Sequence, residues 1–250
     1  MIARTILPAI RLEVRRLRRS PRTGIALALA LTVTAVAVAV LLAGSSPDFA
    51  EAAQLSIFSV LVFLVPYIFT SGILSDEVAA RTLPFLLVRP IGRRAIILAK
   101  FITGTLASWA ALSGAFVVLL VGAAIGSPAM PEPPTVLACL LAMITLATVY
   151  AAVCTLWATV APEASAMGSA LHLFILEFAL AKAPGAMRLP SMNYMAGRLA
   201  GFEPGGFFAD RAPDVGATTA FLIMLGAAAV FLGVALVVVP SREYRLGRGH

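Results

Sequence analysis

The sequence predicts an all-α polytopic membrane protein with six transmembrane helices. Of its 250 residues, 60% are apolar and only 12% are charged, whereas soluble domains have roughly 45–50% and about 25%. A water-soluble core of this length cannot bury so much apolar surface, so we expect the excess to face lipid. The same composition excludes intrinsic disorder. Uncharged runs of about 20 residues, long enough to cross the hydrocarbon core, make the prediction specific.

Six apolar runs are predicted to span the membrane. They cover residues 24–43, 55–74, 101–125, 136–160, 165–181 and 218–239. The first run alternates large and small side chains, but it is about twice as long as a barrel strand and has no polar face, so a helix is expected. A signal peptide would have an apolar region of only about 7–15 residues, so we expect an uncleaved span. No repeat or second domain is evident, and residues 1–250 are treated as one transmembrane domain.

The distribution of lysine and arginine predicts the orientation. Fifteen of the 19 lie in residues 1–23, 75–100 and 240–250, and the other four lie in residues 182–217. Because cytoplasmic segments carry the excess of Lys and Arg, both termini and the 75–100 loop are expected in the cytoplasm. The 182–217 segment is then external. We expect a multi-pass protein of the cell membrane, either the plasma membrane or a bacterial inner membrane.

Residues 1–23 are expected to form an amphipathic helix at the membrane interface. Leu7, Ile10, Val14 and Leu17 recur at spacings of 3, 4 and 3, so they share one helical face. Arginines on the opposite face would lie among anionic head groups. The arginines assigned to this contact are Arg11, Arg15, Arg18 and Arg22. A basic tail that only directs topology is the alternative.

The 75–100 loop contains a short apolar helix flanked by charged residues. Thr82 can cap its N-terminus, and Pro84 is accepted in its first turn. The helix is expected to end near Arg89, because the residue before Pro90 disfavours helical backbone. From these residues alone, the helix could either dock in the groove of a soluble protein or lie on the lipid surface.

The same loop carries a pattern that is found in a known family. The pattern is Glu77, Arg81-Thr82-Leu83, Leu86-Leu87, Arg89-Pro90-Ile91, Arg93 and Lys100-Phe101. With the interfacial helix, six spans and long external segment, it resembles the permease subunits of ATP-binding-cassette (ABC) transporters of the type-2 export branch. The resemblance implies the membrane subunit of an exporter, working as a homodimer or pseudo-dimer with a separate cytoplasmic ABC ATPase. ATP and Mg²⁺ are then expected on the ATPase, and no cofactor, metal or nucleic acid on this chain.

The resemblance also implies which residues contact the ATPase. In the family, the segment between the second and third spans and the interfacial helix transmit closure of the ATPase to the spans. Position by position, the implied contact residues are Glu77, Thr82, Leu83, Leu87, Arg89, Pro90 and Arg93. A rigid helix seated in a nucleotide-dependent groove would convert ATPase dimerisation into rotation of the attached spans.

The sequence has no catalytic motif, but it has two intramembrane ionisable residues. GxxxxGK[ST], HExxH, GxSxG and CxxC are all absent, so we expect a transport permease and not an enzyme. His172 and Glu177 lie within the fifth predicted span, which marks them as a possible polar site. Five residues apart on an α-helix, they are separated by about 140° and cannot line one narrow face. Structural pairing and a proton relay both remain open.

Three further features bear on the packing. Pro66 can kink the second span. The Gly122-xxx-Gly126 pattern either marks close helix packing or arises by chance in a chain rich in Ala and Gly, and we favour chance. The 182–217 segment is too apolar for a free linker, and it is expected either to fold into short helices or to form a plain external cap.

A secondary transporter or a non-transporting membrane assembly factor is the alternative function. A secondary transporter would be expected to have charged or broken helices at paired positions of two related halves, and the sequence shows no such repeat. An assembly factor would bind partners without stimulating ATP hydrolysis.

Reversing the charge of Arg89 or Arg93 is expected to uncouple transport from ATP hydrolysis and to leave the membrane fold intact, because the implied contact with the ATPase is lost. Transport and ATP hydrolysis are measured on the assembled complex. Transport at the wild-type rate in both variants, with the ATPase bound, would show that these residues do not couple the two.

Overall fold

The computed structural model describes residues 10–17, 19–43, 49–73, 92–126, 131–202 and 213–241. Within these ranges the chain forms helices and turns and has no strand. Six helical stretches are long and apolar enough to cross a membrane: Pro21–Leu42, Phe49–Thr70, Arg93–Gly126, Pro133–Val160, Pro162–Ala181 and Ala217–Pro240. The predicted all-α class and the six spans are confirmed.

The spans are built from the following elements. The first span is α2 (Pro21–Leu42), and the second joins α3 (Phe49–Ala53), the π-helix η1 (Gln54–Leu61) and α4 (Val62–Thr70). The third and fourth are α7 (Arg93–Gly126) and α8 (Pro133–Val160). The fifth joins η2 (Pro162–Ala164), α9 (Ser165–Ala170), the π-helix η3 (Leu171–Glu177) and α10 (Phe178–Ala181). The short helices η4 (Gly185–Arg188) and α11 (Met192–Ala200) precede the sixth span, α12 (Ala217–Ser241).

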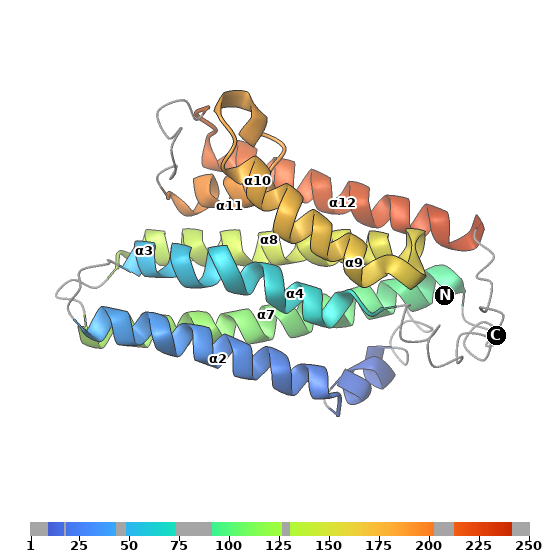
Figure 1. The fold of residues 1–250 in the computed structure, drawn as a ribbon, viewed down its shortest axis with the longest axis horizontal. Coiled ribbons are helices and arrows are strands. Elements are labelled where there is room, and N and C mark those ends of the chain that lie inside the picture. Colours follow the sequence, from blue (N-terminus) through green and yellow to red (C-terminus); the bar gives the residue numbers. More distant parts are fainter. Residues whose placement is uncertain are drawn as a thin grey trace.

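The spans run antiparallel along one long axis (Figure 1). The helix at residues 10–17, the start of α7 and the end of α12 lie at one end of the bundle, which we call the N-terminal end. Helix α11 and the start of α12 lie at the opposite end, which we call the α11 end. The 10–17 helix and α11 are therefore at opposite ends, because five spans, an odd number of crossings, lie between them.

Helix α8 is at the centre of the bundle. It packs against α4, α7, α9, α11 and α12, and most of its side chains from Cys139 to Thr159 are buried. By contrast, α2 and α12 expose large apolar side chains, among them Leu31, Val36, Leu222 and Val230. Such side chains are stable when acyl chains surround them. The outer helices therefore supply the lipid-facing surface and α8 supplies the core.

Eight hydroxyl groups within the spans bond to the backbone of their own helix. Each donates to a carbonyl oxygen one turn earlier, which satisfies it without water. This contact is made by Thr34, Ser56, Thr70, Thr103, Ser108, Thr145, Thr148 and Thr155. Between helices, Trp109 Nε1 donates to Ile144 O and to Thr148 Oγ1, each at 3.2 Å.

Several helix boundaries differ from the predicted ones, and at the start of α2 a side-chain cap sets the boundary. Residues 1–23 are not one helix: the Ser20 hydroxyl accepts from Arg22 N–H at 3.3 Å and caps α2. Arg22 therefore belongs to the first span and not to the preceding helix. Similarly, α7 begins at Arg93, so the last eight residues of the predicted 75–100 loop are helical. The second span begins at Phe49, six residues before the predicted start.

The second and fifth spans each contain a π-helical segment. In the second span, η1 ends at Leu61 and α4, which contains Pro66, follows directly. Proline cannot donate to the carbonyl four residues earlier, and a π-helix shifts the hydrogen bonding to five residues. The second span therefore departs from regular α-helical bonding near its middle; the kink at Pro66 stays a prediction.

Gly122 and Gly126 lie where α7 approaches α2. A Cβ atom at Gly122 would lie 2.5 Å from Val38 Cγ2, and one at Gly126 would lie 3.0 Å from Leu42 Cδ2. Neither position accepts a side chain without movement of its neighbour. Our preference for chance is therefore wrong: the two glycines allow the close approach of two spans.

Gly122→Ala is expected to lower the thermal stability of the chain, because the added Cβ overlaps Val38. Gly114 lies in the same helix and has nothing within 4 Å of an added Cβ, so Gly114→Ala is the matched control. Alanine favours a helix over glycine by about 1 kcal/mol, so the control should keep or raise Tm. Thermal unfolding in detergent measures both variants.

Adding Val38→Ala to Gly122→Ala removes the overlapping methyl groups and should recover part of the lost stability. Equal Tm values for the two glycine variants would contradict close packing at Gly122.

Candidate functional site

At the N-terminal end, a buried ion pair joins the 10–17 helix to the third span. Lys100 Nζ lies 3.2 Å from Glu13 Oε1, and the two side chains are only 7% and 17% exposed. Lys100 is in the second turn of α7. At such burial the attraction between the charges is little screened by solvent. The pair therefore fixes the 10–17 helix to the start of α7.

The arginines predicted to face the interface lie in two environments. Arg11 and Arg15 are exposed on the 10–17 helix, while Leu17 packs against the core. The two-faced character of this helix therefore agrees with the pattern in the sequence. Arg22 is half-buried in α2, and Arg18 lies outside the described residues.

The Arg22 side chain lies against Gly72, which follows α4. A Cβ at Gly72 would overlap the Arg22 guanidinium. The arginine therefore contacts protein at this position instead of projecting only toward lipid.

Of the implied ATPase-contact residues, Arg93 is the one that the structure describes. The others, Glu77, Thr82, Leu83, Leu87, Arg89 and Pro90, lie outside the described residues. Arg93 is the first residue of α7, and the next residue, Arg94, donates from Nε to Leu236 O of α12 at 3.1 Å. Gly92, Arg93, Arg94 and Pro240 line an open depression of the surface. Arg93 thus lies where the third span meets the end of the sixth.

At the α11 end, the Glu177 carboxylate receives four hydrogen bonds although the residue is only 3% exposed. Oε1 accepts from Met192 N–H at 3.2 Å. Oε2 accepts from the Ser191 hydroxyl at 2.9 Å, from Asn193 N–H at 3.2 Å and from the Tyr150 hydroxyl at 3.4 Å. Two carboxylate oxygens offer about four acceptor sites. The buried carboxylate is therefore saturated with donors.

The donors come together because a helix begins beside Glu177. Ser191 is the N-cap of α11, and its hydroxyl accepts from Tyr194 N–H at 3.2 Å. The first amides of a helix have no partner within the helix, and the positive end of the helix dipole favours a carboxylate. Glu177 thus binds the N-terminus of α11 to the fifth span, while Tyr150 adds a contact from α8.

His172 and Glu177 do not form one site. Since η3 is a π-helix, the angle of about 140° expected for an α-helix does not apply to this pair. Their partners nevertheless differ: the His172 ring packs edge-on against Phe231 of α12, with 5.9 Å between centroids. The contacts of Glu177 are those of a structural anchor. The sequence signal for it was Ser191, a capping residue ahead of a short helical segment.

The described residues show no cluster of three or more His, Cys, Asp or Glu side chains that could hold a metal ion. Cys139 and Cys154 are both buried and free.

A family model described as ABC-2 family transporter protein matches residues 9–179, more than half of the chain. The chain belongs to the ABC-2 transporter family. It is a multi-pass membrane permease component of an ABC transporter and is not itself catalytic. The matched region begins at the 10–17 helix and extends past Glu177. A search of curated proteins finds no match.

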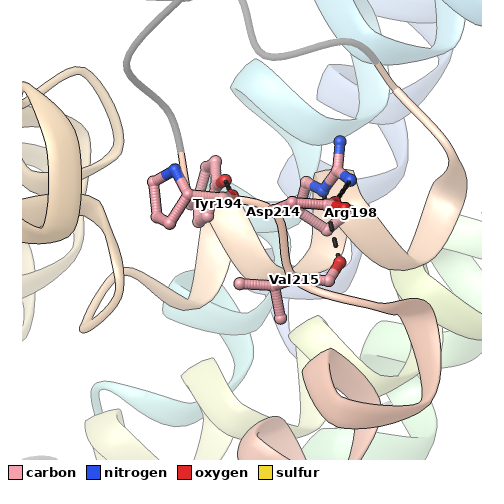
Figure 2. Close-up of polar contacts among 5 residues, drawn as sticks. Tyr194, Arg198, Asp214 and Val215 are labelled. Carbon is pink, nitrogen blue, oxygen red and sulfur yellow. Dashed lines mark hydrogen bonds and ion pairs between the residues drawn. The ribbon is translucent and has the colours of Figure 1, made fainter.

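Beyond the matched region, α11 of the ABC-2 permease is tied to the start of the sixth span (Figure 2). Arg198 donates from Nε to Val215 O at 3.3 Å and pairs through Nη2 with Asp214 at 2.5 Å. The Tyr194 hydroxyl donates to Pro213 O at 2.5 Å. The 182–217 segment contains the two short helices η4 and α11, and their position relative to the membrane stays a prediction.

Glu177→Gln is expected to destabilise the permease, because an amide NH₂ group cannot accept and leaves buried donors unsatisfied. The loss is about 2 kcal/mol in the free energy of unfolding. Thermal unfolding measures it, and limited trypsin digestion reports whether residues 182–198 detach. Transport is measured separately from expression.

The control is Glu163→Gln, which changes an exposed carboxylate in the same span and should behave like the wild type. The anchor assignment fails if Glu177→Gln has wild-type Tm and wild-type trypsin resistance. Loss of transport with unchanged stability would instead favour a proton relay.

Proposed function

We propose that this ABC-2 permease couples ATP hydrolysis by a separate cytoplasmic ABC ATPase to export across the plasma or inner membrane. Family membership supports the pairing with an ATPase of this kind. The observation that carries the coupling is the buried pair between Glu13 and Lys100, because it gives the N-terminal helix a rigid connection to a span.

A buried ion pair resists separation. Removing one partner from such a pair costs about 3–5 kcal/mol, since the other charge stays buried without compensation. Displacement of the 10–17 helix is therefore transmitted to α7 and not absorbed between the two helices. Lys100 is the last residue of the 75–100 segment. The family resemblance places the ATPase contact in that segment.

Hydrogen bonds at the N-terminal end also connect other spans. The Thr23 hydroxyl of α2 donates to Leu17 O of the 10–17 helix at 2.6 Å. Arg94 of α7 bonds to Leu236 of α12. The Ser165 hydroxyl of the fifth span donates to Ser71 O, after the second, at 3.0 Å. A partner that docks at this end would therefore act on several spans at once.

The remaining parts of the proposal follow the family and the charge distribution. Both termini and the 75–100 loop are cytoplasmic, and two permease chains assemble with two ATPase subunits, which hold the ATP and Mg²⁺. Arg93 and the loop residues Glu77, Thr82, Leu83, Leu87, Arg89 and Pro90 contact the ATPase. Arg11 and Arg15 contact anionic head groups, as does Arg18.

The coupling is tested by exchanging the charges of the buried pair. Glu13→Lys and Lys100→Glu, each alone, should reduce permease-dependent ATP hydrolysis at least fivefold, because like charges separate the 10–17 helix from α7. The double variant restores opposite charges and should recover at least half of the activity. Hydrolysis is measured on the permease–ATPase complex in lipid nanodiscs.

Glu132→Lys is the control, because Glu132 is an exposed carboxylate at the α11 end. Full ATP hydrolysis in both single variants would contradict coupling through the pair. The function as a whole fails if affinity purification from native membranes reproducibly recovers no ATP-binding subunit.

A further inference from the structure

A cavity of about 430 Å³ lies at the α11 end between the second and fifth spans and α11. Its walls come from η1, α10, η4 and α11, and none of them belongs to the N-terminal end. The cavity is within the size range of small-molecule sites, roughly 300–1,000 Å³. It is much larger than an inorganic ion needs.

The cavity is positively charged. Lys182, Arg188 and Arg198 line it, and no carboxylate is among its lining residues. Arg198 is paired with Asp214, while Lys182 Nζ lies 4.1 Å from the centre of the Phe178 ring. Lys182 and Arg188 therefore leave about two positive charges without a carboxylate partner in the described part of the chain.

Arg188 is the most informative of these residues. It is only 1% exposed, and its Nε donates to Ala183 O at 2.5 Å. Its Nη2 atom is buried and has no hydrogen-bond partner within the described residues. A buried guanidinium is strongly unfavourable unless an anion or several acceptors surround it. Its unused donors therefore point to an anionic ligand, and planar guanidinium groups bind phosphate well.

Part of the cavity wall is apolar and reaches exposed residues of the second and fifth spans. Phe58 and Phe202 pack edge to face in its wall, with 5.1 Å between ring centroids. Leu55 and Phe178 also line it and are 61% and 47% exposed, so they form part of its rim. These two residues lie on the second and fifth spans, where exposed side chains face acyl chains. A ligand here would combine an anionic group with a hydrocarbon chain.

We propose that this cavity binds the phosphate head group of an anionic phospholipid. The phosphate contacts Arg188 and Lys182, and the first part of an acyl chain follows Leu55 and Phe178 out to the bilayer. This site is independent of the ATPase and goes beyond the coupling function proposed above.

The test measures lipid binding by the full-length chain in detergent at fixed ionic strength, by thermal shift and by native mass spectrometry. The probes are phosphatidylglycerol, phosphatidylcholine and inorganic phosphate. Phosphatidylglycerol should raise Tm and remain bound, while phosphatidylcholine and millimolar phosphate should do neither. Arg188→Gln should weaken phosphatidylglycerol binding about tenfold, the equivalent of one strong charge-assisted contact.

Lys182→Gln tests the site if Arg188→Gln does not fold, because Lys182 is exposed; it should weaken binding severalfold. Arg19→Gln, which removes an exposed arginine before the first span, is the control for general attraction to anionic lipid and should leave affinity unchanged. Wild-type affinity in Lys182→Gln overturns the proposal, as does equal binding of phosphatidylcholine. An equal shift with inorganic phosphate overturns the lipid assignment in favour of a free-anion site.

Discussion

The rest of this structure depends on one constraint: the bilayer core supplies no hydrogen-bond partners. Polar groups in the spans must therefore bond within the protein. Threonine and serine meet the constraint locally, by donating to their own helix, and Trp109 meets it by donating across to α8. Helix α8 is the centre because its small and apolar side chains let five other helices approach it. The contacts that cannot be satisfied within one helix determine how the helices are joined.

Glu177 is the most demanding case of that constraint. A carboxylate within a span needs donors, and the chain provides them by starting α11 beside it. The external segment is consequently part of the bundle and not an appendage. Met195 and Ala196 of α11 are fully buried, so the anchor and the apolar face of α11 support each other. The family match ends at residue 179, yet the contacts of Glu177 extend to residue 193.

The fold class and the six spans could be predicted from the sequence, because a span is a local property of about 20 apolar residues. The amphipathic pattern around Leu17 was also readable, since it repeats within one helix. The partners of Glu177 could not be predicted, because the chain folds back after the fifth span to bring Ser191 to it. The π-helical geometry of η3 could not be predicted from the sequence, so the angle between His172 and Glu177 was calculated for the wrong helix type. The packing at Gly122 depends on Val38, which no local pattern identifies.

Because α7 is long, a small movement at the ion pair near its start produces a larger movement at its other end. The helix has 34 residues, or roughly 50 Å at 1.5 Å per residue. The pair with Glu13 holds it near one end, and Gly122 and Gly126 press it against α2 near the other. Gly126 lies roughly 39 Å beyond Lys100 along the helix, so a tilt of about 5° at Lys100 would displace that end by about 3 Å. A displacement that is too small to break contacts at one end of α7 thus grows to about the diameter of an atom at the other end.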